Sequence, residues 1–195
     1  MCRTQPVPNW DIKLQKVEED AIIKACSYFF LLENVLFERR AIFSDAAEIV
    51  FLFYLDGSST DLNGVSIIVK NTFPNNDVIS RCLRNKSHIN RRDVTTTQRA
   101  ELQAAHLCSR LYALLQDQLR EFLLLFSGKI KFEILSDSEI VLNQIGCLPY
   151  MFKPWVRARI QEIRENVDEK VVFMHVPTQD NIADILTRPY YGPPA

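Results

Sequence analysis

The segment 49–58 reads IVFLFYLDGS, an unbroken apolar run closed by an acid, a glycine and a serine. Short runs rich in β-branched and aromatic residues and bounded by turn formers are typical of buried strands. Asp56 ends this run, so its carboxylate would lie beside the core. An ionised group there is costly unless a partner compensates its charge, and a divalent cation is such a partner. The segment therefore predicts a buried strand with a metal ligand at its end.

Three further acids stand beside apolar segments in the same way. Asp137 follows the strand-like run Ile130–Ser136, and Asp184 lies in a short helical segment at 180–186. Glu101 lies in the first turn of a helix whose apolar residues recur at three- and four-residue steps: Leu102, Ala105, Cys108 (or Leu107), Leu111 and Leu115. Taken singly, Asp137 could be a helix N-cap and Asp184 a solvated helix residue. Taken together, the four acids predict hard oxygen ligands for Mg²⁺, with Mn²⁺ as the alternative.

The order of the remaining elements predicts a mixed α/β domain. Segments 49–55, 65–69 and 78–83 indicate an antiparallel meander separated by turn-forming residues. After the helix that carries Glu101 come a strand at 131–135, a helix ending at Ile145, an amphipathic helix at 152–167 and a strand at 171–176. Upstream, residues 17–36 show a helical apolar repeat. We therefore expect an N-terminal connector with one helix at 1–45, the α/β domain at 46–190 and a tail at 191–195.

Composition bounds the class of protein. The chain has 195 residues, of which 47% are hydrophobic and 24% charged, as in one globular domain with an appendage. No apolar stretch reaches the roughly 18 residues of a membrane span, and Pro6, Pro8 and Asp11 stand where a signal peptide needs an apolar core. We expect an intracellular protein, cytoplasmic or nuclear, that is not secreted and has no membrane partner. Its five cysteines are scattered, which indicates neither a disulfide framework nor a zinc site.

Basic residues gather in two places although the net charge is only −1. Between Arg81 and Arg99 there are six Lys or Arg residues and one acid. A second group lies on the amphipathic helix at 152–167: Lys153, Arg157, Arg159 and Arg164. Local positive charge beside an acidic site suits a metal-dependent enzyme that acts on a phosphate backbone. The alternative for the second group is a solvated helix face.

Four motifs, in their order along the chain, resemble a known family. Asp56-Gly57-Ser58, followed by Gly64-Val65, resembles the first-strand signature of type 1 ribonucleases H. The segments 97–102 (TQRAEL), 136–142 (SDSEIVL) and 175–184 (HVPTQDNIAD) look like the ribonuclease H region of LTR-retrotransposon polyproteins, especially the BEL/Pao group. Together the motifs cover residues 50–188. The resemblance implies a ribonuclease H-like fold, a five-stranded mixed sheet flanked by helices, with an N-terminal helical extension.

The resemblance also implies an activity and a set of residues. The expected reaction is metal-dependent cleavage of the RNA strand of RNA-DNA hybrids, with two Mg²⁺ ions held by Asp56, Glu101, Asp137 and Asp184. Asp56 would bind both ions, Glu101 and Asp137 the ion near the leaving group, and Asp184 the other. The expected nucleic-acid contacts near the acids and on the basic helix are Ser58, Thr97, Arg99, Asn143, Gln144 and Arg157. Residues 1–45 resemble the connector to a reverse transcriptase, so reverse transcriptase and integrase regions of a polyprotein are expected partners.

Several alternatives stay open at this point. Asp45, in Phe43-Ser44-Asp45-Ala46-Ala47, competes with Asp56 as the first acid, but Asp56 follows its strand and has Gly64 at a suitable distance for the return strand. An integrase-type nuclease is disfavoured because its acids usually run Asp, Asp, Glu. A catalytically silent retroelement remnant and a nucleic-acid-binding scaffold are further alternatives. Pro177-Thr178-Gln179 stands where many type 1 enzymes carry a histidine, and His175 is interpreted as a structural residue at a strand end, so slow turnover is expected.

Overall fold

The computed structural model describes residues 41–58, 62–89 and 96–188. The chain divides into two units, Met1–Arg39 and Arg40–Ala195, and all described residues lie in the second unit. The predicted helix at 17–36 and most of the predicted connector therefore lie outside the described residues. Within the described residues, none of the helices combines the length and the hydropathy that a membrane span requires.

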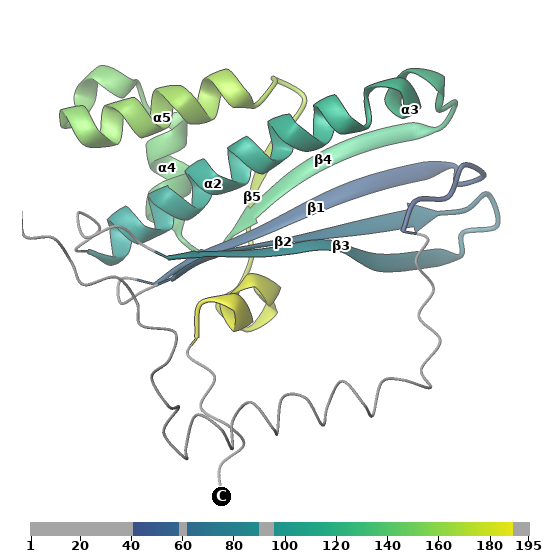
Figure 1. Ribbon diagram of the computed structural model, residues 1–195, viewed down its shortest axis with the longest axis horizontal. Coiled ribbons are helices and arrows are strands. Elements are labelled where there is room, and N and C mark those ends of the chain that lie inside the picture. The colour runs from purple at the N-terminus through teal and green to yellow at the C-terminus, as the bar shows by residue number, and fades with distance from the viewer. Residues whose placement is uncertain (1–40, 59–61, 90–95, 189–195) are drawn as a thin grey trace, which may run out of the picture. The chain divides into compact units, whose positions relative to one another are not determined.

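A five-stranded mixed sheet forms the centre of the second unit (Figure 1). Its strands are β1 (Glu48–Gly57), β2 (Leu62–Thr72), β3 (Val78–Ile89), β4 (Lys129–Ser136) and β5 (Val172–His175). The order across the sheet is β3-β2-β1-β4-β5, in which β1, β2 and β3 are antiparallel neighbours. β4 runs parallel to β1, and β5 runs parallel to β4. The carboxyl ends of β1 and β4 therefore meet at one end of the sheet.

The longer helices cover one face of this sheet (Figure 1). They are α2 (Thr97–Gln118), α3 (Arg120–Leu125), α4 (Glu139–Gly146) and α5 (Pro154–Asn166). Three single 3-10 turns complete the described chain: η1 (Pro149–Met151), η2 (Thr178–Asp180) and η3 (Ile182–Leu186). Figure 1 shows η3 on the opposite face of the sheet from α2. The carboxyl end of β1 therefore has α2 on one side and η3 on the other.

Alternation along β1 sets the core. Ile49, Phe51, Phe53 and Leu55 are at most 1% exposed and line one strand face, as the period of two in a strand requires. On α2, Tyr112 packs edge-on against Phe53 and Phe132, with ring centroids 5.9 Å and 5.3 Å apart. Fully burying such a side chain stabilises the fold by roughly 1.5–3 kcal/mol. This packing fixes the position of α2 across β1. It therefore also fixes where along β1 the side chain of Glu101 lies.

The predicted mixed α/β architecture is confirmed: the sheet is mixed, has five strands and is flanked by helices. Three details of the predicted elements were wrong. β2 and β3 extend beyond 65–69 and 78–83, because edge strand β3 carries exposed polar residues that hide its strand period. The short helix α3 was not predicted, and the closing helix at 180–186 is a pair of 3-10 turns.

Candidate functional site

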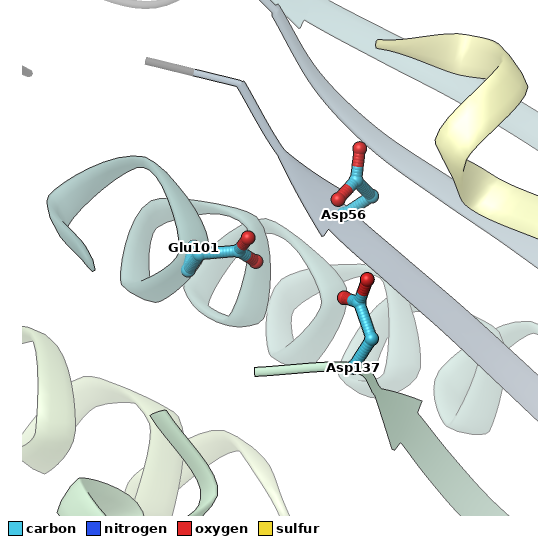
Figure 2. Close-up of side chains that lie close together, drawn as sticks. All are labelled: Asp56, Glu101 and Asp137. Carbon is cyan, nitrogen blue, oxygen red and sulfur yellow. The ribbon is translucent and has the colours of Figure 1, made fainter. Parts of the chain in front are cut away.

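Three carboxylates from three different elements converge at the carboxyl ends of β1 and β4. Asp56 lies near the end of β1, Asp137 directly follows β4, and Glu101 lies on the second turn of α2. One carboxylate oxygen from each lies within 4.8 Å of the others. Figure 2 shows the three side chains pointing toward a common space. A group of hard oxygen donors with this spacing suits a divalent cation.

Gly57 allows α2 to approach β1 this closely. A Cβ on Gly57 would stand 2.4 Å from the carbonyl carbon of Ala100 and 2.5 Å from the backbone nitrogen of Glu101. These are backbone atoms of a helix and cannot move independently, so a larger residue here would displace the start of α2. The Gly57 backbone also hydrogen bonds with the Glu101 carboxylate. The Asp-Gly pair therefore supplies one ligand and the room for another.

The electrostatics of the group favour a bound cation. Burial, and then the negative charges of Asp56 and Asp137, raise the pKa of Glu101 from 4.5 to about 8. Burial is also the largest cause that raises the pKa of Asp56. Glu101 is 9% exposed, and its Oε2 is buried without a hydrogen-bond partner. Buried oxygen atoms are rarely left unpaired, so an unpaired carboxylate oxygen facing two other carboxylates fits the site of a hard divalent cation.

Thr187 holds Asp56 from the opposite side of the sheet. Its hydroxyl donates a hydrogen bond to Asp56 Oδ2 and lies 3.0 Å from the carbonyl oxygen of Asp184. This bond lowers the pKa of Asp56, against the larger effect of burial. Gly64 on β2 makes the contact feasible, because a Cβ there would lie 2.7 Å from Leu186 Cβ and 3.1 Å from Thr187 Cγ2. The segment that carries η3 is thereby tied to the end of β1.

Asn181 holds Asp137 in a similar way. Its side-chain nitrogen donates to Asp137 Oδ1 at 3.2 Å and to the Leu55 carbonyl at 2.9 Å. Its own side-chain oxygen accepts from the backbone of Ala183 at 3.2 Å. The N-cap of α4 is Ser138, whose hydroxyl accepts from Val141 N at 3.4 Å. Asp137 is therefore not the N-cap, and its carboxylate faces the other two acids.

Asp184 lies beside this group without joining it. It sits in η3, and its carboxylate forms an ion pair with Arg188, N to O 2.5 Å. The group of three carboxylates within 4.8 Å does not include it. Its charge nevertheless raises the pKa of Asp56, so the two acids interact. The proposed role of Asp184 as the ligand of a second ion stays a prediction.

The six residues predicted to contact nucleic acid lie at the end of β1 and on α2, α4 and α5, and their side chains have different surroundings. Ser58 directly follows β1, and Thr97 is the first residue of α2. The Arg99 guanidinium lies over the Trp155 ring, 5.4 Å from its centroid. Asn143 and Gln144 lie on α4, where Asn143 is exposed and Gln144 Oε1 is buried without a partner. Arg157 Nη2 donates to the carbonyls of Tyr150 and Phe152, so it also holds η1 to α5.

The structure places Asp45, the competing candidate for the first acid, away from Asp56. It also adds two residues to the site, Asn181 and Thr187. Asp45 is exposed in the turn that precedes β1, so the length of β1, about 30 Å at 3.3 Å per residue, separates it from Asp56. His175 ends β5 and pairs in register with Ser136. Asn181 and Thr187 were missed as site residues. Asn181 lies inside the 175–184 motif, whereas nothing local in the sequence marks Thr187.

No protein-family model matches this chain, and no curated protein matches its sequence. Solved structures with some similarity include LC11 ribonuclease H1, isolated from compost by a metagenomic approach: 18% identity, TM-score 0.46, covering 72% of this chain and 92% of that one. Ribonuclease H1 from the archaeon Halobacterium salinarum has 18% identity and a TM-score of 0.38, covering 71% and 93%. The prototype foamy virus protease-reverse transcriptase has 16% identity and a TM-score of 0.45, covering 77% of this chain and 21% of that one.

Proposed function

We propose that this chain is a metal-dependent endoribonuclease that cleaves the RNA strand of RNA-DNA hybrids. The observation that carries the proposal is the convergence of Asp56, Glu101 and Asp137 within 4.8 Å, with Glu101 Oε2 buried and unpaired. A scaffold that only packs would be more stable without these charges, because buried acids with raised pKa values destabilise the fold at neutral pH. The arrangement therefore favours an active nuclease over a silent remnant.

The acidic residues of the site fit Mg²⁺, with Mn²⁺ as the alternative. Some residues would bind the cations and others would orient the binding residues. Divalent cations supply a more acidic attacking water and stabilise the leaving oxygen of a phosphodiester. Asp56, Glu101 and Asp137 would hold these cations, and Asp184 would add a ligand once Arg188 released it. Thr187 and Asn181 orient the Asp56 and Asp137 carboxylates, so that little reorganisation is needed when a cation arrives.

Recognition of the hybrid is proposed to use groups beside the acids. Ser58 and Thr97 stand at the ends of the two elements that carry Asp56 and Glu101, where hydroxyls can meet a 2′-hydroxyl. Asn143, Gln144, Arg99 and Arg157 would add contacts on α4, α2 and α5. The motifs also support an origin in an LTR retrotransposon polyprotein of the BEL/Pao kind, with reverse transcriptase and integrase regions as partners. These assignments rest on the motif resemblance.

The test is a panel of end-labelled substrates: an RNA-DNA hybrid, single-stranded RNA, double-stranded RNA and double-stranded DNA, each with Mg²⁺, Mn²⁺ or EDTA. We expect cutting of the RNA in the hybrid alone, and only with a metal. Asp56→Asn should abolish it, whereas Asp180→Asn, which removes a nearby exposed carboxylate in η2, should not. Cutting of single-stranded RNA at the same rate, or cutting that survives in Asp56→Asn, would reject the proposal.

A further inference from the structure

Edge strand β3 carries a row of cations on the helix-covered face of the sheet. Arg81, Arg84 and Lys86 pair with Val69, Ile67 and Val65 of β2, and directly opposed residues of an antiparallel pair share a face. The three valine and isoleucine partners are core residues, at most 1% exposed. A bulge at Leu83 keeps Arg81 and Arg84 on this face although they are three residues apart. The three cations, the β3 row, therefore point to the same side as α2.

Positive charge is not neutralised along the second half of this strand. β3 contains no acid between Val78 and Ile89. Arg84 and Lys86 form no ion pair with any residue in the described ranges, and Arg84 is exposed. Elsewhere in the described part of the chain, cations such as Lys131 and Arg188 are paired with acids. Cations without neighbouring acids are complementary to a phosphate backbone.

The length of the row suits a nucleic-acid duplex that lies along it. Residues two apart on a strand are about 6.8 Å apart. Phosphates on one strand of a duplex follow every 3.4 Å or so of helix axis, so a duplex whose axis runs along the row carries phosphates past each of its cations. From Val65 to Val69, the partners of Lys86 and Arg81, the row spans about 14 Å.

The row begins beside the acids and leads away from them. Asp56, Gly64 and Ser87 stand in one register line across β1, β2 and β3. Lys86 is one residue along from that line and two strands across, about 10 Å from the Asp56 backbone. Arg81 lies on the register line of Phe51, which is five residues or about 17 Å from Asp56 along β1. A duplex cut at the acids would cover this distance with about five base pairs.

We propose that the β3 row is a second contact surface for the duplex, holding the phosphate backbone of the hybrid within about five base pairs of the cut. This inference rests on the proposed function for the identity of the duplex. It predicts that the chain binds hybrids that extend past the site on the β3 side with higher affinity than hybrids that end at the site.

The experiment is binding of a fluorescent RNA-DNA hybrid, followed by anisotropy in EDTA so that no strand is cut, between about 50 and 200 mM salt. The test variant is Arg84→Gln/Lys86→Gln, and Arg84→Lys/Lys86→Arg retains the charge. Lys70→Gln is the matched control, because Lys70 is exposed on the neighbouring strand and opposes Ser80 on the other face. Unfolding midpoints of all variants check that each is folded.

Loss of two phosphate contacts should reduce the slope of log K against log salt by about 2. The ratio of wild-type to variant affinity should then be about 12-fold larger at 50 mM than at 200 mM salt. The charge-retaining variant and Lys70→Gln should keep the wild-type slope. An unchanged slope in the double glutamine variant, or an equal reduction in Lys70→Gln, would overturn the proposal.

Failure of the surface and failure of the nuclease can be told apart. If the wild type cuts the hybrid in Mg²⁺ but the double variant keeps its salt slope, the β3 row is rejected and the nuclease stands. If the slope falls as predicted but the wild type cuts nothing, the surface is supported and the nuclease is rejected. In an extension of the assay, lengthening the duplex on the β3 side over about the first five base pairs from the site should raise the wild-type to variant affinity ratio.

Discussion

Glu101→Gln should stabilise the metal-free protein, and the gain should grow with pH. The pKa of Glu101 is about 8 in the fold against an ordinary 4.5, chiefly because the side chain is buried and then because Asp56 and Asp137 repel its charge. An acid whose pKa is raised on folding favours the fold below its ordinary pKa, and that contribution is lost as the pH rises toward the folded value. The window is therefore pH 4.5 to about 8. Glutamine removes the charge and keeps an oxygen for the Gly57 hydrogen bond.

The magnitude follows from the two pKa values. At about 1.36 kcal/mol per pH unit, the difference between 4.5 and about 8 corresponds to about 5 kcal/mol above pH 9. At pH 7 only the part between 4.5 and 7 has been lost, which is about 3 kcal/mol. The side chain is 9% exposed, so solvent screening reduces these figures little. The glutamine variant should therefore match the wild type near pH 4.5 and exceed it increasingly above that.

The assay is urea unfolding in EDTA at pH 5, 7 and 9, comparing midpoints at unchanged slope. Glu165→Gln, an exposed position on α5, is the matched control and should follow the wild type at every pH. Replacing the EDTA with free Mn²⁺ at about 100 times its dissociation constant should restore about 2.7 kcal/mol to the wild type and much less to Glu101→Gln. Parallel pH profiles for wild type and Glu101→Gln would refute the reasoning, because they would mean that burial places no charge penalty on Glu101.

Three further predictions concern the surroundings of the acids. Thr187→Val should lower metal-free stability by about 1.5–3 kcal/mol at a pH where Asp56 is ionised, because it removes a hydrogen bond to a buried carboxylate, and Thr187→Ser should restore most of it in urea unfolding. Gly57→Ala should reduce hybrid cleavage at least about 100-fold by displacing α2, whereas Gly146→Ala, with open space around its added Cβ, should cleave at the wild-type rate. Arg188→Ala should tighten Mn²⁺ binding by up to about fivefold in calorimetry, since it frees Asp184; unchanged affinity would mean that Asp184 does not reach the cation.

The parts of the fold that could be predicted from sequence are those with a local signal. The apolar runs that end at Asp56 and Asp137 predicted two central strands, and the periodicity after Glu101 predicted α2 and its buried stripe. The hydrogen bonds that orient the acids could not be predicted in this way. Thr187 and Asp56 are 131 residues apart, and Asn181 and Leu55 are 126 apart. Such contacts depend on how η3 packs against β1 and β2, which no local pattern encodes.

The full length of strand β3 could not be predicted from the local sequence either. Its second half carries Arg84, Lys86 and His88, which are typical of a solvated turn or loop in the sequence. An edge strand that is largely exposed can carry such residues without cost, because only one side of it pairs with a neighbour. The basic character of this region was predicted from composition. Its common face and its regular spacing became visible only through the register with β2.

The proposed nuclease is tested most simply by cleavage of a labelled RNA-DNA hybrid in Mg²⁺ or Mn²⁺ by the intact chain and by Asp137→Asn, with single-stranded RNA as the control. The asparagine keeps the size of the side chain and removes one of the three converging charges. We predict metal-dependent cutting of the hybrid by the wild type and its loss in Asp137→Asn. Absence of cutting by the wild type in both metals, or equal cutting by the variant, would contradict the proposed function.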